Sequence, residues 1–134
     1  MRWVHLPDGT PVLIRPIVPE DKTLLLQYLL RLSPQSAYRR FMAPLKSLSE
    51  RQLEYLTDID YNDHMAWTAV DPLEPGHPLL GVARYIRFTG DPRRAEVAAM
   101  VLDSHQGRGL GTLLFSMLWQ SAVANGIDVF VAYV

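Results

Sequence analysis

Three glycines spaced two residues apart form the part of this sequence best suited to chemistry. Gly107, Gly109 and Gly111 lie between an apolar run and a pattern with helical spacing. Glycine leaves the backbone amides accessible, and the first amides of a helix are unpaired and carry a positive partial charge. The segment Gln106–Thr112 therefore predicts a binding loop for an anionic group, with Arg108 as an added positive charge.

The spacing and neighbours of these glycines distinguish between several kinds of glycine loop. A sharp strand-to-helix turn needs only the conformational freedom of glycine and no ligand. A nucleoside-triphosphate loop needs a lysine before its serine or threonine, whereas Thr112 follows Gly111 directly. A dinucleotide loop needs another glycine register and a βαβ unit, which the chain before Gly107 does not provide. Two interpretations of the glycine loop remain, a plain strand-to-helix turn and a phosphate-binding site of another type.

The hydrophobic pattern predicts the elements that position this loop. Asp8-Gly9 favours a tight hairpin turn, Pro19-Glu20-Asp21 predicts the start of a helix, and Gly126 predicts a helix end. The predicted strands cover residues 3–6, 11–17, 65–70, 80–89, 95–102 and 128–134, and the predicted helices cover 19–33, 35–42, 49–58 and 110–126.

The order of these segments predicts one mixed sheet. Residues 90–94 are a turn by composition, so the strands on either side of them should pair antiparallel. The segment 128–134 follows a helix and should lie parallel to 95–102 through a right-handed crossover. We find no repeat or linker, so residues 1–134 are expected to form a single domain.

Composition excludes several classes of protein. The 134 residues carry a formal net charge of −1 and contain no cysteine. This predicts no binding of nucleic acid or of an anionic membrane surface, no thiolate metal site and no acyl-cysteine intermediate. No signal peptide or apolar run of membrane-spanning length is present, so we expect a cytoplasmic protein.

Other candidate residues carry weaker signals. The four histidines, which include His64 and His105, lack metal-ligand spacing, so we predict no metal site. The cluster Tyr38-Arg39-Arg40-Phe41 fits either recognition of an acidic surface or the face of an amphipathic helix. We interpret Trp67, Trp119 and Phe115 as core residues. Asp58, Asp60 and Asp63 fit a helix end and turn, and could also attract a cationic amine.

With these elements in place, the sequence resembles the GNAT N-acetyltransferase superfamily. The family motif, Gln/Arg-x-x-Gly-x-Gly/Ala, is met by Gln106, Gly109 and Gly111. Ile14-Arg15-Pro16 with Asp21 resembles the family's first strand and helix start. The cluster at 38–41, with Leu48-Ser49, Leu56-Thr57 and Asp60-Tyr61, is further similar to the bacterial protein-lysine acetyltransferases. The resemblance implies an α+β fold with three α/β layers, in which a mixed, mostly antiparallel sheet is flanked by helices.

The resemblance also implies a ligand and its contacts. Acetyl-coenzyme A would be the co-substrate, with its pyrophosphate on the glycine loop and its pantetheine arm along the preceding strand. One backbone amide near Val101 would face the thioester carbonyl and stabilise charge that develops during attack. The implied coenzyme-binding residues are Met100, Val101, Leu102, Gln106, Gly107, Arg108, Gly109, Leu110, Gly111 and Thr112.

Glu96 is the candidate general base. A lysine amine has a reference pKa of about 10.4, so it must lose a proton before it attacks a thioester. Strand alternation places Glu96 on one face with Ala98 and Met100, and the resembled branch uses a glutamate at this place. Glu96 could instead be a solvated acid beside Arg93 and Arg94.

The end of the sequence leaves two functions open. The segment 128–134 resembles the family's fifth core strand, and members continue with a helix and two strands, so we expect a C-terminally truncated domain. One function is direct acetyl transfer from acetyl-CoA to an amine, such as a lysine of a substrate protein. The other is a non-catalytic acyl-CoA-binding or regulatory module. An exposed fifth strand also predicts a homo-oligomer.

Overall fold

A computed structural model describes every residue except 1, 32–48, 103–104, 106 and 133–134. The strands are β1 (Arg2–His5), β2 (Pro11–Pro16), β3 (His64–Val70), β4 (Leu79–Phe88), β5 (Asp91–Val101) and β6 (Val129–Val131). The helices are η1 (Pro19–Asp21), α1 (Lys22–Arg31), α3 (Glu50–Thr57) and α4 (Leu110–Ala124).

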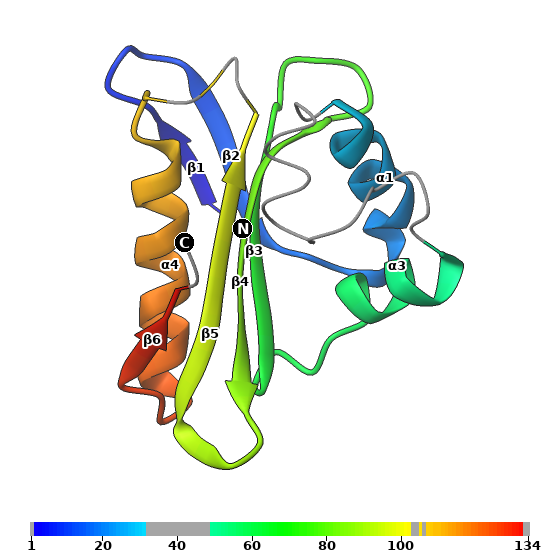
Figure 1. Cartoon of the computed structure of the whole chain (residues 1–134). Coiled ribbons are helices and arrows are strands. Elements are labelled where there is room, and N and C mark those ends of the chain that lie inside the picture. Colours follow the sequence, from blue (N-terminus) through cyan, green and yellow to red (C-terminus); the bar gives the residue numbers. More distant parts are fainter. Residues whose placement is uncertain (1, 32–48, 103–104, 106, 133–134) are drawn as a thin grey trace.

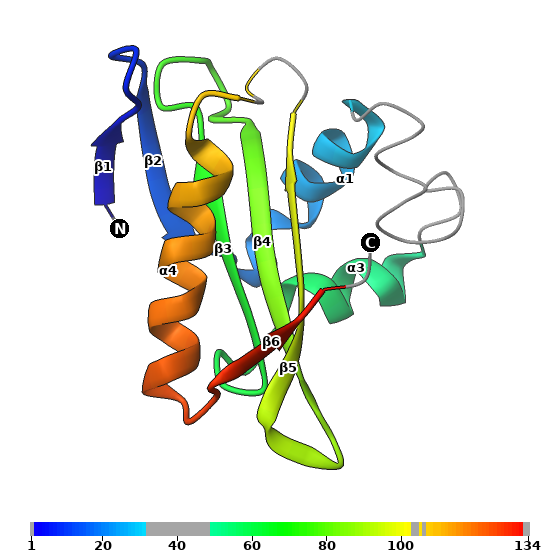
Figure 2. The ribbon, with the colours of Figure 1, turned by 60° about the vertical axis from the view of Figure 1, so that its left-hand side comes forward.

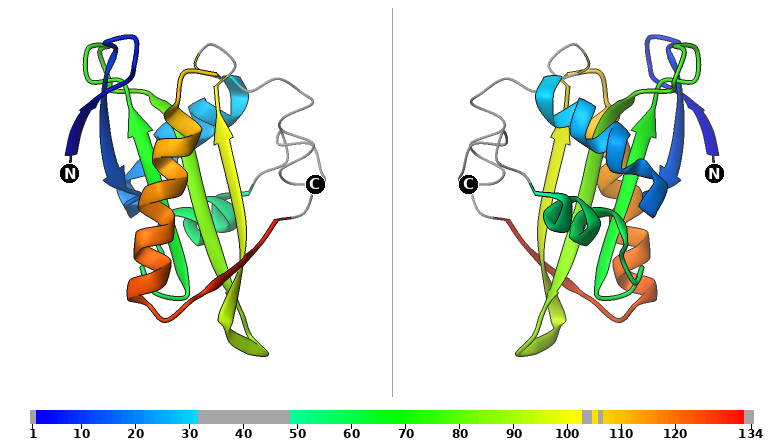
Figure 3. Two further views of the ribbon diagram at one scale, coloured as in Figure 1. Left: turned by 90° about the vertical axis from the view of Figure 1, so that its left-hand side faces the viewer. Right: turned by 90° about the vertical axis from the view of Figure 1, so that its right-hand side faces the viewer.

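The six strands form one sheet in sequence order. The pairs from β1 to β5 are antiparallel, and β6 is parallel to β5. Helix α4 covers one face of this sheet, and α1 and α3 cover the other (Figures 1 and 3). This confirms the predicted three-layer α+β fold with its mixed, mostly antiparallel sheet.

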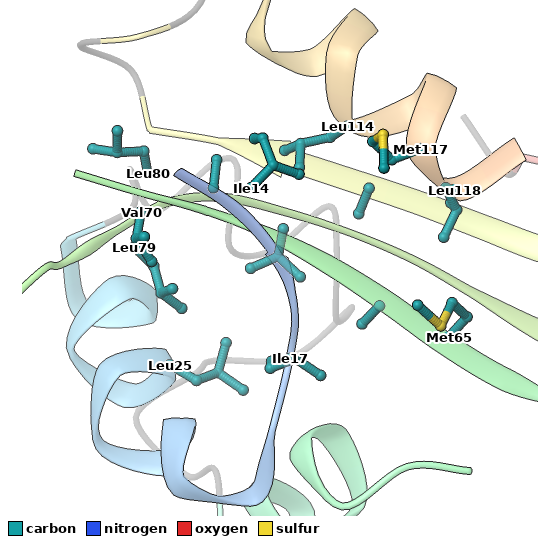
Figure 4. Packing of buried hydrophobic residues seen from close by; sticks show 14 of the residues in the cluster. Ile14, Ile17, Leu25, Met65, Val70, Leu79, Leu80, Leu114, Met117 and Leu118 are labelled. Atoms are coloured by element: carbon teal, nitrogen blue, oxygen red, sulfur yellow. The ribbon is translucent and has the colours of Figure 1, made fainter. Parts of the chain in front are cut away.

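Apolar side chains fill both spaces between the layers. In Figure 4, Leu114, Met117 and Leu118 of α4 lie on one side of the sheet, while Leu25 of α1 and Ile17 lie on the other. All five are buried. Burial of such side chains is the main source of stability in a domain of this size, at about 1.5–3 kcal/mol for each large aliphatic residue.

Local sequence signals account for the helix ends. Ser49 caps α3, because its Oγ accepts a hydrogen bond from the amide of Gln52 at 3.1 Å while Gln52 Oε1 accepts one from the amide of Ser49 at 2.7 Å. Gly126 follows α4 with a φ of 82°, as expected for a C-terminal cap. The predicted helix at 35–42 and the cluster at 38–41 lie outside the described residues.

Two sequence predictions are wrong. Residues 91–94 belong to β5 and are not a turn, so the β4–β5 hairpin is longer than predicted and Phe88 pairs with Asp91. Phe115 and Trp119 are not core residues, since their exposed fractions are 44% and 37%. Both lie edge-on to Phe130 of β6 on the outer side of α4.

Candidate functional site

The glycine loop connects the end of β5 to the start of α4. Gly107 and Gly109 have φ angles of 75° and 88°, in the left-handed region that favours glycine. Gly109 is the N-cap of α4 and supplies no side-chain acceptor, and the first turn of α4 has no acidic residue. The strand-to-helix junction predicted from the sequence is confirmed. Gln106 lies outside the described residues.

The first amides of α4 are suited to an anion. The earliest helical bond in α4 is donated by the amide of Leu113 to the carbonyl of Gly109 at 3.1 Å. The amides of Leu110, Gly111 and Thr112 come before this bond, in the first turn of the helix, where backbone amides have no intrahelical partner. Unpaired amides at the positive end of a helix dipole favour a phosphate group.

Arg108 does not extend freely from this loop. Its Nε lies 2.8 Å and its Nη2 lies 2.6 Å from Asp8 Oδ2, and Nη2 also donates to Thr10 Oγ1. The β1–β2 turn therefore binds the guanidinium of Arg108, the positive charge that the sequence analysis predicted for an anionic ligand. The pKa of nearby His105 is lowered by burial and by Arg108, which favours a neutral imidazole.

Strand β6 pairs with β5 over a short stretch only. The pairs are Arg94 with Val129, Ala95 with Phe130 and Glu96 with Val131. Beyond Glu96, no β5 residue has a β6 partner in the described part of the chain. Figure 2 shows β6 crossing β5 at an angle, so the two strands diverge toward the end of the sheet that carries the glycine loop.

The hydrogen-bond register decides which β5 backbone groups face this divergence. The amide of Leu102 donates to the carbonyl of Leu80 at 2.9 Å, so Leu102 points toward β4. Antiparallel pairing alternates, so Met100 also bonds toward β4 while Ala99 and Val101 turn their backbone groups away from it. Of the three β5-end residues predicted from the sequence, only Val101 presents its backbone to the divergence. Ala99, which the sequence analysis missed, does so too.

Glu96 lies where β5 and β6 separate. Ala98 and Met100 line a small gap beneath α1, so the side chain of Glu96 faces the α1 and α3 side of the sheet by strand alternation. It is half-buried and makes no hydrogen bond or ion pair within the described residues. Arg93 instead pairs with Asp128. The structure places Ala98 and Met100 on one face as predicted, and both the orientation and the role of Glu96 stay predictions.

A buried arginine, which the sequence analysis did not single out, shares this face. Arg84 of β4 is 4% exposed and donates to the carbonyl of Leu56 at 3.0 Å. Its Nη1 also lies 2.8 Å from Nε2 of His64. Arg84 of β4 pairs with Ala98 of β5, and Ala98 lies two residues after Glu96 on the same strand. The cross-strand neighbours of Arg84, Ala66 and Ala98, are small and leave room for a guanidinium above the sheet, but no local sequence pattern signals this arrangement.

A larger hollow lies at the other end of α4. It has a volume of about 600 Å³ and is lined by Arg15, Pro16, Val18, Tyr61, Met65, Ser121, Ala124 and Asn125. Its polar side chains already have partners: Arg15 binds Asp21, Ser121 binds Trp67 and Asn125 binds Tyr85. We therefore place the candidate site at the glycine loop and Glu96 and not in this hollow.

No group of three or more His, Asp or Glu side chains in the described residues is placed to hold a metal ion. Among the same residues, no helix is long and apolar enough to cross a membrane.

Comparison with known proteins connects this geometry to a family. Residues 12–134 match the family described as acetyltransferase (GNAT) domain. The chain is 36% identical over 125 residues to acetyltransferase PA5475 of Pseudomonas aeruginosa, covering 92% of the chain and 67% of that protein. It is 34% identical to acetyltransferase Pat of Mycolicibacterium smegmatis, covering 98% of the chain and 38% of that protein.

A solved structure agrees with these sequence matches. The GNAT domain of S. lividans PAT superposes with a TM-score of 0.86 at 32% identity. The superposition covers 98% of this chain and 76% of that one.

Proposed function

The chain belongs to the GNAT family of acetyl-CoA-dependent N-acetyltransferases, and on this basis we propose that its acceptor is a protein lysine and that Glu96 is the general base. In this reaction the lysine nitrogen forms a bond to the acetyl carbon, the thioester C–S bond breaks, and coenzyme A leaves as the thiol. The sequence contains no cysteine, so an acyl-cysteine intermediate is excluded within these residues and we propose direct attack on the thioester.

The position of Glu96 carries this proposal. It is the last β5 residue paired with β6, so its carboxylate lies where the two strands begin to diverge. The ammonium of a lysine has to lose its proton before attack, and a carboxylate within reach, directly or through one water molecule, can accept it. The Glu96 carboxylate makes no hydrogen bond or ion pair within the described residues, unlike a paired surface acid such as Asp128.

The glycine loop supports coenzyme binding. We place the pyrophosphate at the backbone amides of Gly107–Thr112 and the pantetheine arm along β5. Ala99 turns its backbone groups toward the divergence of β5 and β6, where an extended ligand could pair as a strand would, and Val101 faces the same way. A backbone amide near Val101 would stabilise the developing oxyanion.

The choice of acceptor rests on two similarities. The names Pat and PAT belong to two of the similar proteins, and residues such as Asp60-Tyr61 resemble the bacterial protein-lysine acetyltransferases. The exposed side chain of Asp58, at the C-terminal end of α3, is available to attract a cationic lysine, whereas Asp63 is paired with Arg87. We also propose self-association through β6, which is an edge of the described sheet.

Substitution of Glu96 tests the proposed chemistry. Titration calorimetry with acetyl-CoA should give the same Kd within about twofold for wild type and Glu96→Gln, because the glycine loop is unchanged. Acetylation of a lysine-containing protein, followed by mass spectrometry at pH 7, should be about 10²–10⁴-fold slower in the variant. The deficit should shrink toward pH 10, where the amine loses its proton unaided.

Glu74→Gln, a neutralisation in the exposed β3–β4 loop, is the matched control and should leave both measurements unchanged. Equal turnover by Glu96→Gln and wild type would rule out Glu96 as the base. Tight acetyl-CoA binding by the wild type without transfer to any lysine would instead favour a non-catalytic binding module.

A further inference from the structure

The turn between β1 and β2 lies against the glycine loop. A Cβ at Gly109 would be 3.5 Å from Cδ of Pro7, so loop and turn are in close contact. Figure 1 shows the turn beside the first residues of α4. The two segments are about one hundred residues apart in sequence, so this contact exists only in the folded protein.

Asp8 uses both carboxylate oxygens at this contact. Oδ1 accepts the amide of Thr10 at 3.0 Å, which closes the turn, and Oδ2 accepts Nε of Arg108 at 2.8 Å and also Nη2. Hydrogen bonds from Thr10 and Arg108 lower the pKa of Asp8 to about 2, so its carboxylate is charged at neutral pH.

The glycine loop needs an external contact of this kind. Gly107 and Gly109 both adopt positive φ, and glycine loses more conformational freedom on ordering than any other residue. Among the described residues, no atom lies within 4 Å of the Cβ position of Gly107, so this side of the residue is not packed against them. A loop held in its binding conformation before the ligand arrives does not lose that freedom on binding.

We propose that Asp8 and Thr10 are positioning residues for the coenzyme: they hold Arg108 and thereby keep the amides of Gly107–Thr112 arranged for the pyrophosphate. Arg108 is then a structural clamp that faces the β1–β2 turn, and it is not the direct partner of the phosphate. This inference rests on the proposed function, in which the loop binds acyl-CoA.

The substitution Asp8→Asn tests the clamp with little disturbance of the turn. The asparagine side-chain oxygen can still accept the amide of Thr10, whereas the charge and the acceptor for Arg108 are lost. Because an exposed ion pair has a modest energy, we expect the Kd for acetyl-CoA to rise by about fivefold. Turnover of S-acetylpantetheine, which lacks the pyrophosphate, should stay at the wild-type rate.

Asp128→Asn is the matched control. It removes an exposed aspartate–arginine pair, with Arg93, at a distance from the loop, and should not change the Kd for acetyl-CoA. Amide hydrogen exchange without coenzyme provides a second readout, in which Asp8→Asn should accelerate exchange at residues 107–112 and Asp128→Asn should not.

A double-mutant cycle identifies the residue through which Asp8 acts. If the clamp is correct, Arg108→Met should raise the Kd by a similar factor, and Asp8→Asn should add nothing in that background. Tighter binding by Asp8→Asn would overturn the proposal, since Arg108 would then be a phosphate ligand withheld by Asp8. An unchanged Kd would overturn it as well. Failure of the wild type to bind acetyl-CoA would contradict the proposed function itself.

Discussion

At the scale of the residue, Asp21 joins the end of β2 to the start of the first helix. It is 3% exposed, and its oxygens accept hydrogen bonds from Nη1 and Nη2 of Arg15, each at 2.7 Å, and from the amide of Val18 at 2.9 Å. The Asp21 carboxylate raises the pKa of the Arg15 guanidinium. The ion pair therefore closes the short loop after β2, and each of its two charges is compensated by the other.

Asp21→Asn should destabilise the fold. It leaves the largely buried Arg15 without a counter-charge, and removal of one partner from a buried pair costs about 3 kcal/mol. Urea unfolding followed by circular dichroism measures this change as a lower midpoint. Asp128→Asn, which breaks an exposed pair, should cost about 0.5 kcal/mol or less. A loss below about 1 kcal/mol for Asp21→Asn would show that this pair is not a stabilising contact.

Residue type predicts some parts of the site and misses others. The glycines at 107 and 109 were predictable because few other residues tolerate their backbone angles, and the face of Glu96 follows from strand alternation. The pairing of Arg108 with Asp8 was not predictable, because no local pattern encodes a contact across one hundred residues. The exposure of Trp119 was missed because an apolar side chain does not have to be buried.

At the scale of the element, the approach of α4 to the sheet depends on Gly81. A Cβ at this position would lie 2.9 Å from Cδ1 of Leu114 and 3.1 Å from the backbone oxygen of Met100. Helix α4 therefore contacts β4 at a point where no side chain fits. Since the glycine loop opens α4, the position of the loop depends on this contact.

Gly81→Ala should destabilise the protein by about 1–3 kcal/mol, because the added methyl group overpacks the α4–sheet interface. Displacement of α4 should also weaken acetyl-CoA binding, measured by calorimetry on the folded variant. Gly90→Ala is the matched control, as nothing lies within 4 Å of its Cβ position and its φ is not positive. A Gly81→Ala protein as stable as Gly90→Ala would contradict the assignment of a close contact.

Element boundaries were predictable where capping residues mark them. Ser49 set the start of α3 through its own side chain, and Gly126 marked the end of α4. The start of β5 was missed because Gly90-Asp91-Pro92 has the composition of a turn. In the folded chain Arg87 donates to Asp63 at 2.8 Å and also to the carbonyl of Pro92, so tertiary contacts hold the hairpin where composition disfavours a strand.

At the scale of the whole molecule, the order of strands and helices could be read from hydrophobic periodicity. The parallel placement of β6 followed from the crossover through α4. The divergence of β6 from β5 could not be predicted, because the pattern of 128–134 is that of a strand throughout, whereas the described residues pair with β5 only as far as Val131. Pairing length depends on where neighbouring strands lie in space, and a single strand's pattern carries no such information.

Self-association is the prediction that belongs to this scale. In the described residues, β6 forms the edge of the sheet, with Val129 43% exposed. Phe115, Trp119 and Val123 form an exposed apolar stripe along α4, and the first two pack against β6. An unpaired edge next to an apolar stripe favours contact with another copy of the chain.

Sedimentation velocity over a range of concentrations should therefore show a sedimentation coefficient that rises with concentration. Val129→Lys should reduce this association, because lysine on an edge strand opposes edge-to-edge pairing. Leu73→Lys places the same charge on an exposed leucine of the β3–β4 loop and should leave association unchanged. A wild-type protein that sediments as a monomer at every concentration would exclude the β6 edge as an interface. Equal effects of the two lysine substitutions would point to net charge, which acts on the whole molecule, and not to the edge.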